Sequence, residues 1–229
     1  MATGIGTAGA AASAHRYAAL RVTEIFHSLQ GESSRVGLPT VFIRLTGCPL
    51  RCLWCDSEYA FSGGSSMALE QVLAAVASHD CRTVCVTGGE PLAQAGCATL
   101  LASLCDVGYS VSLETSGALD ISGVDRRVVR VMDLKAPGSG EADKNLWANL
   151  DHLRAQDELK FVLASEQDYL WAKQRLTELH LAEVCGLLFA PVHGMLDPAL
   201  LADWVLRDRL PVRLQLQLHK ILWGAERGR

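Results

Sequence analysis

Residues 40–46 (TVFIRLT) form a short apolar run rich in β-branched residues, and the loop after it, residues 47–55 (GCPLRCLWC), carries three cysteines. Six similar runs follow, at 83–87, 109–114, 128–134, 159–164, 185–190 and 212–218. They alternate with stretches of helical length and pattern at 67–79, 92–107, 144–154, 166–180 and 197–208. Such alternation is typical of parallel strands joined by right-handed crossovers.

The length of the chain limits the kind of α/β fold. A complete eight-fold β/α barrel takes about 250 residues, and this chain has 229. We therefore predict a shortened, open (partial) β/α barrel of six to seven mostly parallel strands, with a doubly wound open sheet as the alternative. Residues 1–19 are rich in Ala, Gly and Ser and are expected to be a flexible extension, which leaves residues 20–229 as a single domain.

Composition excludes several classes of protein. With 49% hydrophobic and 20% charged residues, the chain can bury a core, which excludes an intrinsically disordered protein. The formal net charge of −4 lacks the basic excess of a nucleic-acid-binding protein. No apolar run approaches the roughly 20 residues that span a bilayer, and the first residues do not resemble a secretory signal. We expect a cytoplasmic protein that binds neither nucleic acid nor membrane.

Polar residues gather directly after the predicted strands. The carboxyl ends of parallel strands meet at one edge of a sheet, so these residues are expected to share one rim, where β/α barrels carry their chemistry. The clusters are the cysteine loop, Thr87–Pro91, Glu114–Gly117, Asp133–Lys135, Pro191–Gly194 and His219–Lys220.

The cysteines fall into two groups. Cys81, Cys85, Cys97, Cys105 and Cys185 lie in apolar segments and are expected to pack in the core as small hydrophobic residues. Cys48, Cys52 and Cys55 have the spacing C-x3-C-x2-C in a loop suited to a metal centre. Structural zinc usually takes four ligands, and no second close pair lies on the same rim. An iron–sulfur cluster held by three thiolates would leave one iron open, but a zinc-stabilised binding module remains an alternative.

Two motifs together resemble the radical S-adenosylmethionine superfamily: the cysteine triplet with Trp54 before its last member, and Gly88-Gly89-Glu90-Pro91 after the next strand. The resemblance implies that Cys48, Cys52 and Cys55 hold a 4Fe-4S cluster. It also implies that the open iron binds the amino and carboxylate groups of S-adenosyl-L-methionine.

Further segments resemble the 7-carboxy-7-deazaguanine synthase family, from about residue 20 to 223. They are residues 24–32 (EIFHSLQGE), 42–48 (FIRLTGC), 55–57 (CDS) and 215–220 (QLQLHK). The family contracts 6-carboxy-5,6,7,8-tetrahydropterin to a deazaguanine with loss of ammonia, in the pathway to queuosine in tRNA. A glycyl-radical-enzyme activating enzyme shares the cysteine spacing and is the alternative among enzymes, although it has no reason to carry Gln30, Glu32, Arg44 and His219.

The resemblance assigns roles residue by residue. For S-adenosylmethionine it implies Trp54, Cys55, Asp56, Gly89, Glu90, Asp133, Leu134 and Lys135. For the pterin it implies Leu29, Gln30, Gly31, Glu32, Arg44, Thr87 and His219, with Arg44 on the substrate carboxylate. Mg²⁺ would be bound by Ser57, where most members have threonine, and Ser33 stands where a glycine is common. A flavodoxin-type reductant and a homodimer are also implied, and no acid or base of the protein is assigned to catalysis.

Overall fold

The computed structural model describes residues 19–224 and 226–229, so all of the expected N-terminal extension except Ala19 lies outside the described residues. The described chain forms one sheet of nine strands in the order β3-β1-β2-β4-β5-β6-β7-β8-β9. From β2 to β9 every neighbouring pair is parallel, whereas β1 and β3 join antiparallel. The sheet is not closed, which confirms the predicted partial barrel. The strands are β1 (Leu20–Leu29), β2 (Pro39–Leu45), β3 (Ser65–Met67), β4 (Thr83–Gly88), β5 (Ser110–Thr115), β6 (Val129–Lys135), β7 (Glu158–Leu163), β8 (Gly186–Pro191) and β9 (Arg213–Leu214).

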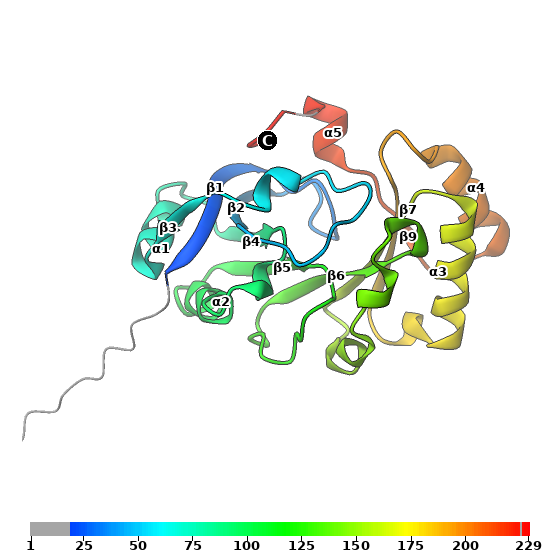
Figure 1. The fold of residues 1–229 in the computed structure, drawn as a ribbon, viewed down its shortest axis with the longest axis horizontal. Coiled ribbons are helices and arrows are strands. Elements are labelled where there is room, and N and C mark those ends of the chain that lie inside the picture. Colours follow the sequence, from blue (N-terminus) through cyan, green and yellow to red (C-terminus); the bar gives the residue numbers. More distant parts are fainter. Residues whose placement is uncertain (1–18, 225) are drawn as a thin grey trace, which may run out of the picture.

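Four helices lie around the outside of the curved sheet, and a fifth lies beside its open side (Figure 1). They are α1 (Leu69–Ala77), α2 (Cys97–Asp106), α3 (Glu166–Glu178), α4 (Pro198–Asp208) and α5 (Leu218–Trp223). Local chemistry sets their starts: the Asp197 carboxylate accepts a hydrogen bond from the Ala199 amide, and Pro198 takes the first helical position. Among the described helices, none combines the length and apolar character needed to cross a membrane.

Successive side chains of each strand point alternately into the hydrophobic core and into the interior of the barrel. On β6, Met132 and Leu134 belong to the hydrophobic core, while Asp133 and Lys135 line a cavity on the other face of the sheet. On β4, Val84 and Val86 belong to the core and Thr87 lines the cavity. This period of two is the pleat of the strand itself. It places polar side chains inside the barrel without removing apolar ones from the core.

The structure differs from the sequence prediction in five segments. Strands β1 and β3 were not predicted, and the strand expected at 212–218 ends at Leu214, before α5 begins at Leu218. The helix expected at 92–107 is a 3-10 turn, Pro91–Ala93, followed by α2 from Cys97. The helix expected at 144–154 is mainly a 3-10 helix, Trp147–His152.

Asparagine side chains explain the last difference. The Asn145 side chain accepts from the Lys135 amide at 2.8 Å and donates to its carbonyl at 2.9 Å. The Asn149 amide donates to the carbonyls of Gly117 and Leu119. Such contacts to distant backbone groups compete with regular helix.

The five cysteines predicted for the core are buried to different degrees. Cys97 belongs to the core, and Cys81, Cys105 and Cys185 pack against it, partly buried. Cys85 is also buried, but on the face of β4 that it shares with Thr87 rather than in the core cluster. Burial raises the pKa of the Cys85 thiol well above its usual value.

Candidate functional site

A cavity of about 830 Å³ occupies the interior of the partial barrel. Its lining comes from the segment after β1, the loops after β2, β4, β5, β6 and β8, and the C-terminal segment. The structure brings every site residue predicted from the sequence to this cavity, except Glu90. They are Leu29, Gln30, Gly31, Glu32, Arg44, Cys48, Cys52, Trp54, Cys55, Asp56, Ser57, Thr87, Gly89, Asp133, Leu134, Lys135 and His219. Leu134 borders the cavity although its side chain belongs to the hydrophobic core.

Backbone hydrogen bonds hold the cysteine loop against two neighbouring loops. The Glu90 amide donates to the Gly47 carbonyl at 2.8 Å, and the Leu53 amide donates to the Ser139 carbonyl at 3.0 Å. Arg51 donates to the Cys48 carbonyl at 2.8 Å. A side chain at Gly89 could not be accommodated, because a Cβ there would lie 2.4 Å from the Gly47 carbonyl oxygen. The loop after β4 therefore approaches the cysteine loop at a distance that only glycine permits.

The three cysteine thiols line the cavity from one loop. Among the described residues no three His, Cys, Asp or Glu side chains are placed to hold one metal ion. Thiolates that each bind a different iron need not converge on one point. Burial raises the pKa of the Cys48 and Cys52 thiols, and Lys135 acts in the opposite direction. A positive charge beside Cys52 favours the thiolate form that a metal requires.

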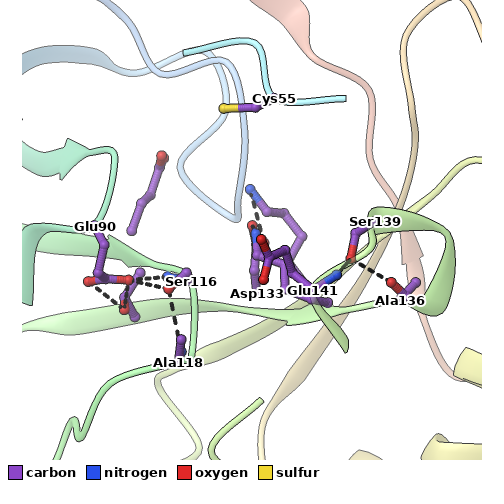
Figure 2. A network of polar contacts seen from close by, with 12 residues as sticks. Cys55, Glu90, Ser116, Ala118, Asp133, Ala136, Ser139 and Glu141 are labelled. Carbon is purple, nitrogen blue, oxygen red and sulfur yellow. Dashed lines mark hydrogen bonds and ion pairs between the residues drawn. The ribbon is translucent and has the colours of Figure 1, made fainter. Parts of the chain in front are cut away.

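The carboxylate of Glu90 lies outside the cavity, contrary to the prediction that it faces S-adenosylmethionine. Its side chain is fully buried and accepts hydrogen bonds from the Leu92 amide, the Thr115 hydroxyl, and the amide and hydroxyl of Ser116. Figure 2 shows this carboxylate turned towards Ser116 and away from Cys55. Because Thr115 and Ser116 lie at the end of β5 and directly after it, Glu90 joins the loop after β4 to the loop after β5.

The segment after β1 forms the end of the cavity nearest the amino ends of the strands. Gln30 is 3% exposed and donates to Glu114 at 3.4 Å. Glu32 accepts from Gln215 at 3.1 Å and from Gln217 at 2.9 Å. The Gly31 carbonyl accepts from the Leu218 amide, and a Cβ at Gly31 would collide with the His219 ring. The C-terminal segment therefore packs directly on this end of the cavity.

Buried charges of both signs lie on the strands of the interior. The Lys160 ammonium lies 2.6 Å from Glu32 and 3.4 Å from Asp133, and Lys135 lies 2.8 Å from Asp133. Burial opposes ionisation of Asp133, but Lys135 and Lys160 outweigh it and lower the pKa of Asp133. Burial raises the pKa of Glu114, which accepts from the Thr87 hydroxyl at 3.1 Å. The interior is thus a network of paired charges.

Two residues of this network were missed as site residues. Lys160 interrupts the apolar strand ELKFVL, and a charged residue inside such a strand is the signal that could have identified it. Glu114 was placed in a polar cluster after its strand, but no role was given to it.

Arg44 belongs to a separate group with Glu24 and Tyr59. Its Nε donates to Glu24 at 2.7 Å, and the Tyr59 hydroxyl donates to the same carboxylate oxygen at 2.8 Å. Tyr59 and Glu24 raise the pKa of Arg44 despite its burial. The Arg227 guanidinium lies 4.2 Å from the centre of the Tyr59 ring. Among the described residues, the Arg44 side chain donates to Glu24 alone, which leaves its terminal amino groups for an anionic ligand.

Ser57 and Asp56 follow the cysteine loop. The Ser57 hydroxyl makes no capping hydrogen bond to the short helix that follows it. It lies 3.8 Å from the Cys55 sulfur. Asp56 accepts from Lys220 at 2.7 Å and from Gln217 at 3.2 Å. Lys220 and Gln217 lower the pKa of Asp56 although burial opposes them.

Comparison with known proteins gives consistent matches. The model of the Radical SAM superfamily matches residues 42–134. A 7-carboxy-7-deazaguanine synthase of Chlorobaculum tepidum is 47% identical over 212 residues, which cover 91% of this chain and 96% of that protein. One of Koribacter versatilis is 42% identical over 223 residues, covering 90% and 98%. The crystal structure of QueE from Escherichia coli is similar in fold, with a TM-score of 0.72 at 23% identity, covering 88% of this chain and 95% of that one.

Proposed function

The chain belongs to the 7-carboxy-7-deazaguanine synthase family, and on this premise we propose that its cavity converts 6-carboxy-5,6,7,8-tetrahydropterin to 7-carboxy-7-deazaguanine with loss of ammonia. The observation that carries the proposal is the shared cavity. Three cysteines of one loop, an arginine with free donors and the Gln30–Glu32 segment all line it. A glycyl-radical activating enzyme would instead need an open groove for a protein loop.

The cofactor side of the cavity is the wall that carries the cysteines. Cys48, Cys52 and Cys55 would hold a 4Fe-4S cluster, and Trp54 to Asp56, Gly89 and Asp133 to Lys135 would hold S-adenosylmethionine. When bound, cluster and S-adenosylmethionine together supply the radical that removes a hydrogen atom from the substrate. The protein positions the two ligands and excludes water. Glu90 contributes indirectly, by fixing the Gly88–Gly89 loop against Ser116.

The substrate side is formed by Arg44 and by the segment after β1. Arg44 would bind the substrate carboxylate, and Gln30 and Glu32 would bind the amide-like edge of the pterin, which presents both donors and acceptors. Thr87 and His219 complete this wall. Burial lowers the pKa of His219, which favours the neutral ring, able to donate at one nitrogen and accept at the other.

We propose Ser57 as the protein ligand of Mg²⁺, together with substrate oxygens and water. Its hydroxyl lines the cavity and serves no helix cap. Ser57→Ala should raise the Mg²⁺ concentration needed for half-maximal turnover, whereas Ser62→Ala, on the exposed turn beyond, should leave it unchanged. A Mg²⁺ titration identical to that of the wild type would remove Ser57 from this role.

Further parts of the proposal rest on the family alone: a flavodoxin-type reductant, a homodimer, and action in the cytoplasm on the pathway to modified tRNA without binding nucleic acid or membrane. Size-exclusion chromatography with light scattering measures the assembly. Reduction by purified flavodoxin, compared with dithionite, measures the electron donor.

Anaerobic turnover tests the function itself. Iron- and sulfide-loaded protein is mixed with the carboxytetrahydropterin, S-adenosylmethionine, Mg²⁺ and dithionite, and the deazapurine is detected by mass spectrometry. We expect product that is absent with Cys52→Ala. No product from protein that contains four irons per chain would refute the synthase. Zinc near one per chain, with no iron, would favour the binding module instead.

A further inference from the structure

Lys160 lies at the middle of β7 and faces the cavity, and the family resemblance assigned it no role. Its neighbours Leu159 and Phe161 point the other way and belong to the hydrophobic core. Its side chain is 10% exposed, and in the sheet it stands opposite Asp133 of β6. A lysine almost never occupies such a position without partners.

The partners of Lys160 come from both walls of the cavity. Its ammonium lies 2.6 Å from Glu32, on the side proposed for the pterin, and 3.4 Å from Asp133, on the side proposed for S-adenosylmethionine. The contact with Glu32 joins residues 128 positions apart in the sequence. Burial alone would lower the pKa of Lys160, but the carboxylates of Asp133, Glu32 and Glu114 outweigh it, so the side chain stays charged.

Packing of the core does not require a lysine at this position. Replacing a buried ion pair by apolar residues is often neutral or stabilising, because desolvation of the charges opposes their attraction. The strand already supplies its core contacts through Leu159, Phe161 and Leu163. What the ammonium does contact is a pair of carboxylates, Glu32 at 2.6 Å and Asp133 at 3.4 Å.

We propose that Lys160 is a positioning residue that holds Glu32 and Asp133 in place and thereby sets the pterin ring and S-adenosylmethionine in their relative positions. This inference rests on the proposed function, since it takes Glu32 as a pterin contact and Asp133 as a contact of S-adenosylmethionine. Lys160 acts through these two carboxylates and need not touch either ligand.

A pair of double-mutant cycles tests the proposal, because residues that act through one another have non-additive effects. The dissociation constants of the pterin and of S-adenosylmethionine are measured by anaerobic calorimetry on cluster-loaded protein. The variants are Lys160→Met, Glu32→Gln, Asp133→Asn, and Lys160→Met combined with each of the other two. Lys173→Met is the control, because Lys173 pairs with Asp208 on the outer helices at 2.8 Å. Free energies of unfolding are recorded in parallel.

We expect Lys160→Met to raise both dissociation constants at least tenfold and Lys160→Arg to restore part of each. In the Glu32→Gln background, Lys160→Met should change pterin affinity less than about twofold, and in the Asp133→Asn background it should change S-adenosylmethionine affinity equally little. Lys173→Met should change neither constant. Losses that add fully in both cycles, or unchanged constants for Lys160→Met, overturn the proposal.

Two further results keep the test decisive. If Lys160→Met does not fold, Lys160→Gln replaces it, since it removes the charge but keeps a donor. If the wild-type protein does not bind the pterin, the proposed function fails, and the Asp133 cycle with S-adenosylmethionine alone still decides whether Lys160 acts on that side.

Discussion

Glu90 provides the sharpest test of what the structure adds to the motif. In the sequence it completes Gly-Gly-Glu, and the resemblance implies that it contacts S-adenosylmethionine. In the structure its carboxylate is fully buried and accepts from the Ser116 amide at 2.6 Å, the Leu92 amide at 2.9 Å and the Thr115 hydroxyl at 2.9 Å. The two interpretations predict opposite results for the same substitution.

The expected loss in free energy of unfolding follows from the hydrogen-bond donors that lose Glu90 as their acceptor. Glu90→Ala leaves two backbone amides and two hydroxyls, and each buried donor without an acceptor costs about 1–3 kcal/mol. The hydroxyls can turn to other acceptors, and removal of a buried charge offsets part of the cost. We therefore expect the free energy of unfolding to fall by about 2–4 kcal/mol, or roughly 5–15 °C in Tm for a chain of this size. Glu90→Gln keeps one acceptor oxygen and should lose less.

Anaerobic urea unfolding of the cluster-loaded protein measures the stability, and calorimetry measures S-adenosylmethionine binding. The control is Glu70→Gln, at an exposed position of α1, where a change within about 0.5 kcal/mol is expected. Glu90→Gln should lose stability while the dissociation constant of S-adenosylmethionine changes less than about threefold. The reasoning fails if Glu90→Gln is as stable as the wild type and its dissociation constant rises tenfold or more.

Three other predictions concern single residues. Arg44→Ala removes a charge-assisted contact worth about 1.5–3 kcal/mol, so calorimetry should show pterin affinity lowered roughly 10- to 150-fold with S-adenosylmethionine affinity unchanged; equal losses for both ligands would contradict the assignment. Ser33 has a φ of +67°, in the left-handed region that glycine adopts more readily than other residues. The free energy of unfolding of Ser33→Gly should therefore be about 1 kcal/mol higher than that of Ser33→Ala, and the reverse order would show that the backbone at Ser33 is not strained. Burial lowers the pKa of His219 in the folded state, so the folded protein binds fewer protons at this residue than the unfolded chain does. The free energy of unfolding should therefore fall as the pH drops below about 6.5. His219→Gln should flatten this decline when urea unfolding is measured from pH 7 to 5, and an equally steep decline in the variant would show that other groups cause it.

The sequence was sufficient wherever local pattern decides the structure. Apolar runs such as 83–87 and 128–134 became β4 and β6 within one or two residues, because parallel strands buried on one face by helices need continuous apolar character. The rule that strand ends share one rim then brought Thr87, Asp133 and the cysteine loop to one cavity. These inferences need no knowledge of contacts distant in sequence.

The features that were not predicted from the sequence depend on contacts between residues far apart in the chain. Strand β1 pairs antiparallel with β2 and β3, and its sequence lacks the apolar continuity used to find the other strands. The proposed role of Lys160 depends on its contact with Glu32, and this contact forms only when the segment after β1 folds into the barrel. The direction of the Glu90 side chain depends on the position of the loop after β5, which a motif of adjacent residues does not encode.

The open side of the barrel explains why the substrate end of the cavity is built from irregular segments. The interior of a closed β/α barrel is filled by layers of side chains, whereas here β3 and β9 are unpaired edges of the described sheet and the interior holds a cavity. Residues 31–33 and 215–218 join each other: the Ser33 amide donates to Gln215 at 2.5 Å, and the Leu218 amide donates to the Gly31 carbonyl at 3.0 Å. Figure 1 shows α5, which follows these contacts, beside the open side of the sheet. Glu32 lies in the first of these segments and His219 directly follows the second, so the contact between the segments also forms the proposed pterin wall. Substitutions that loosen this contact should weaken pterin binding before they affect the cysteine loop.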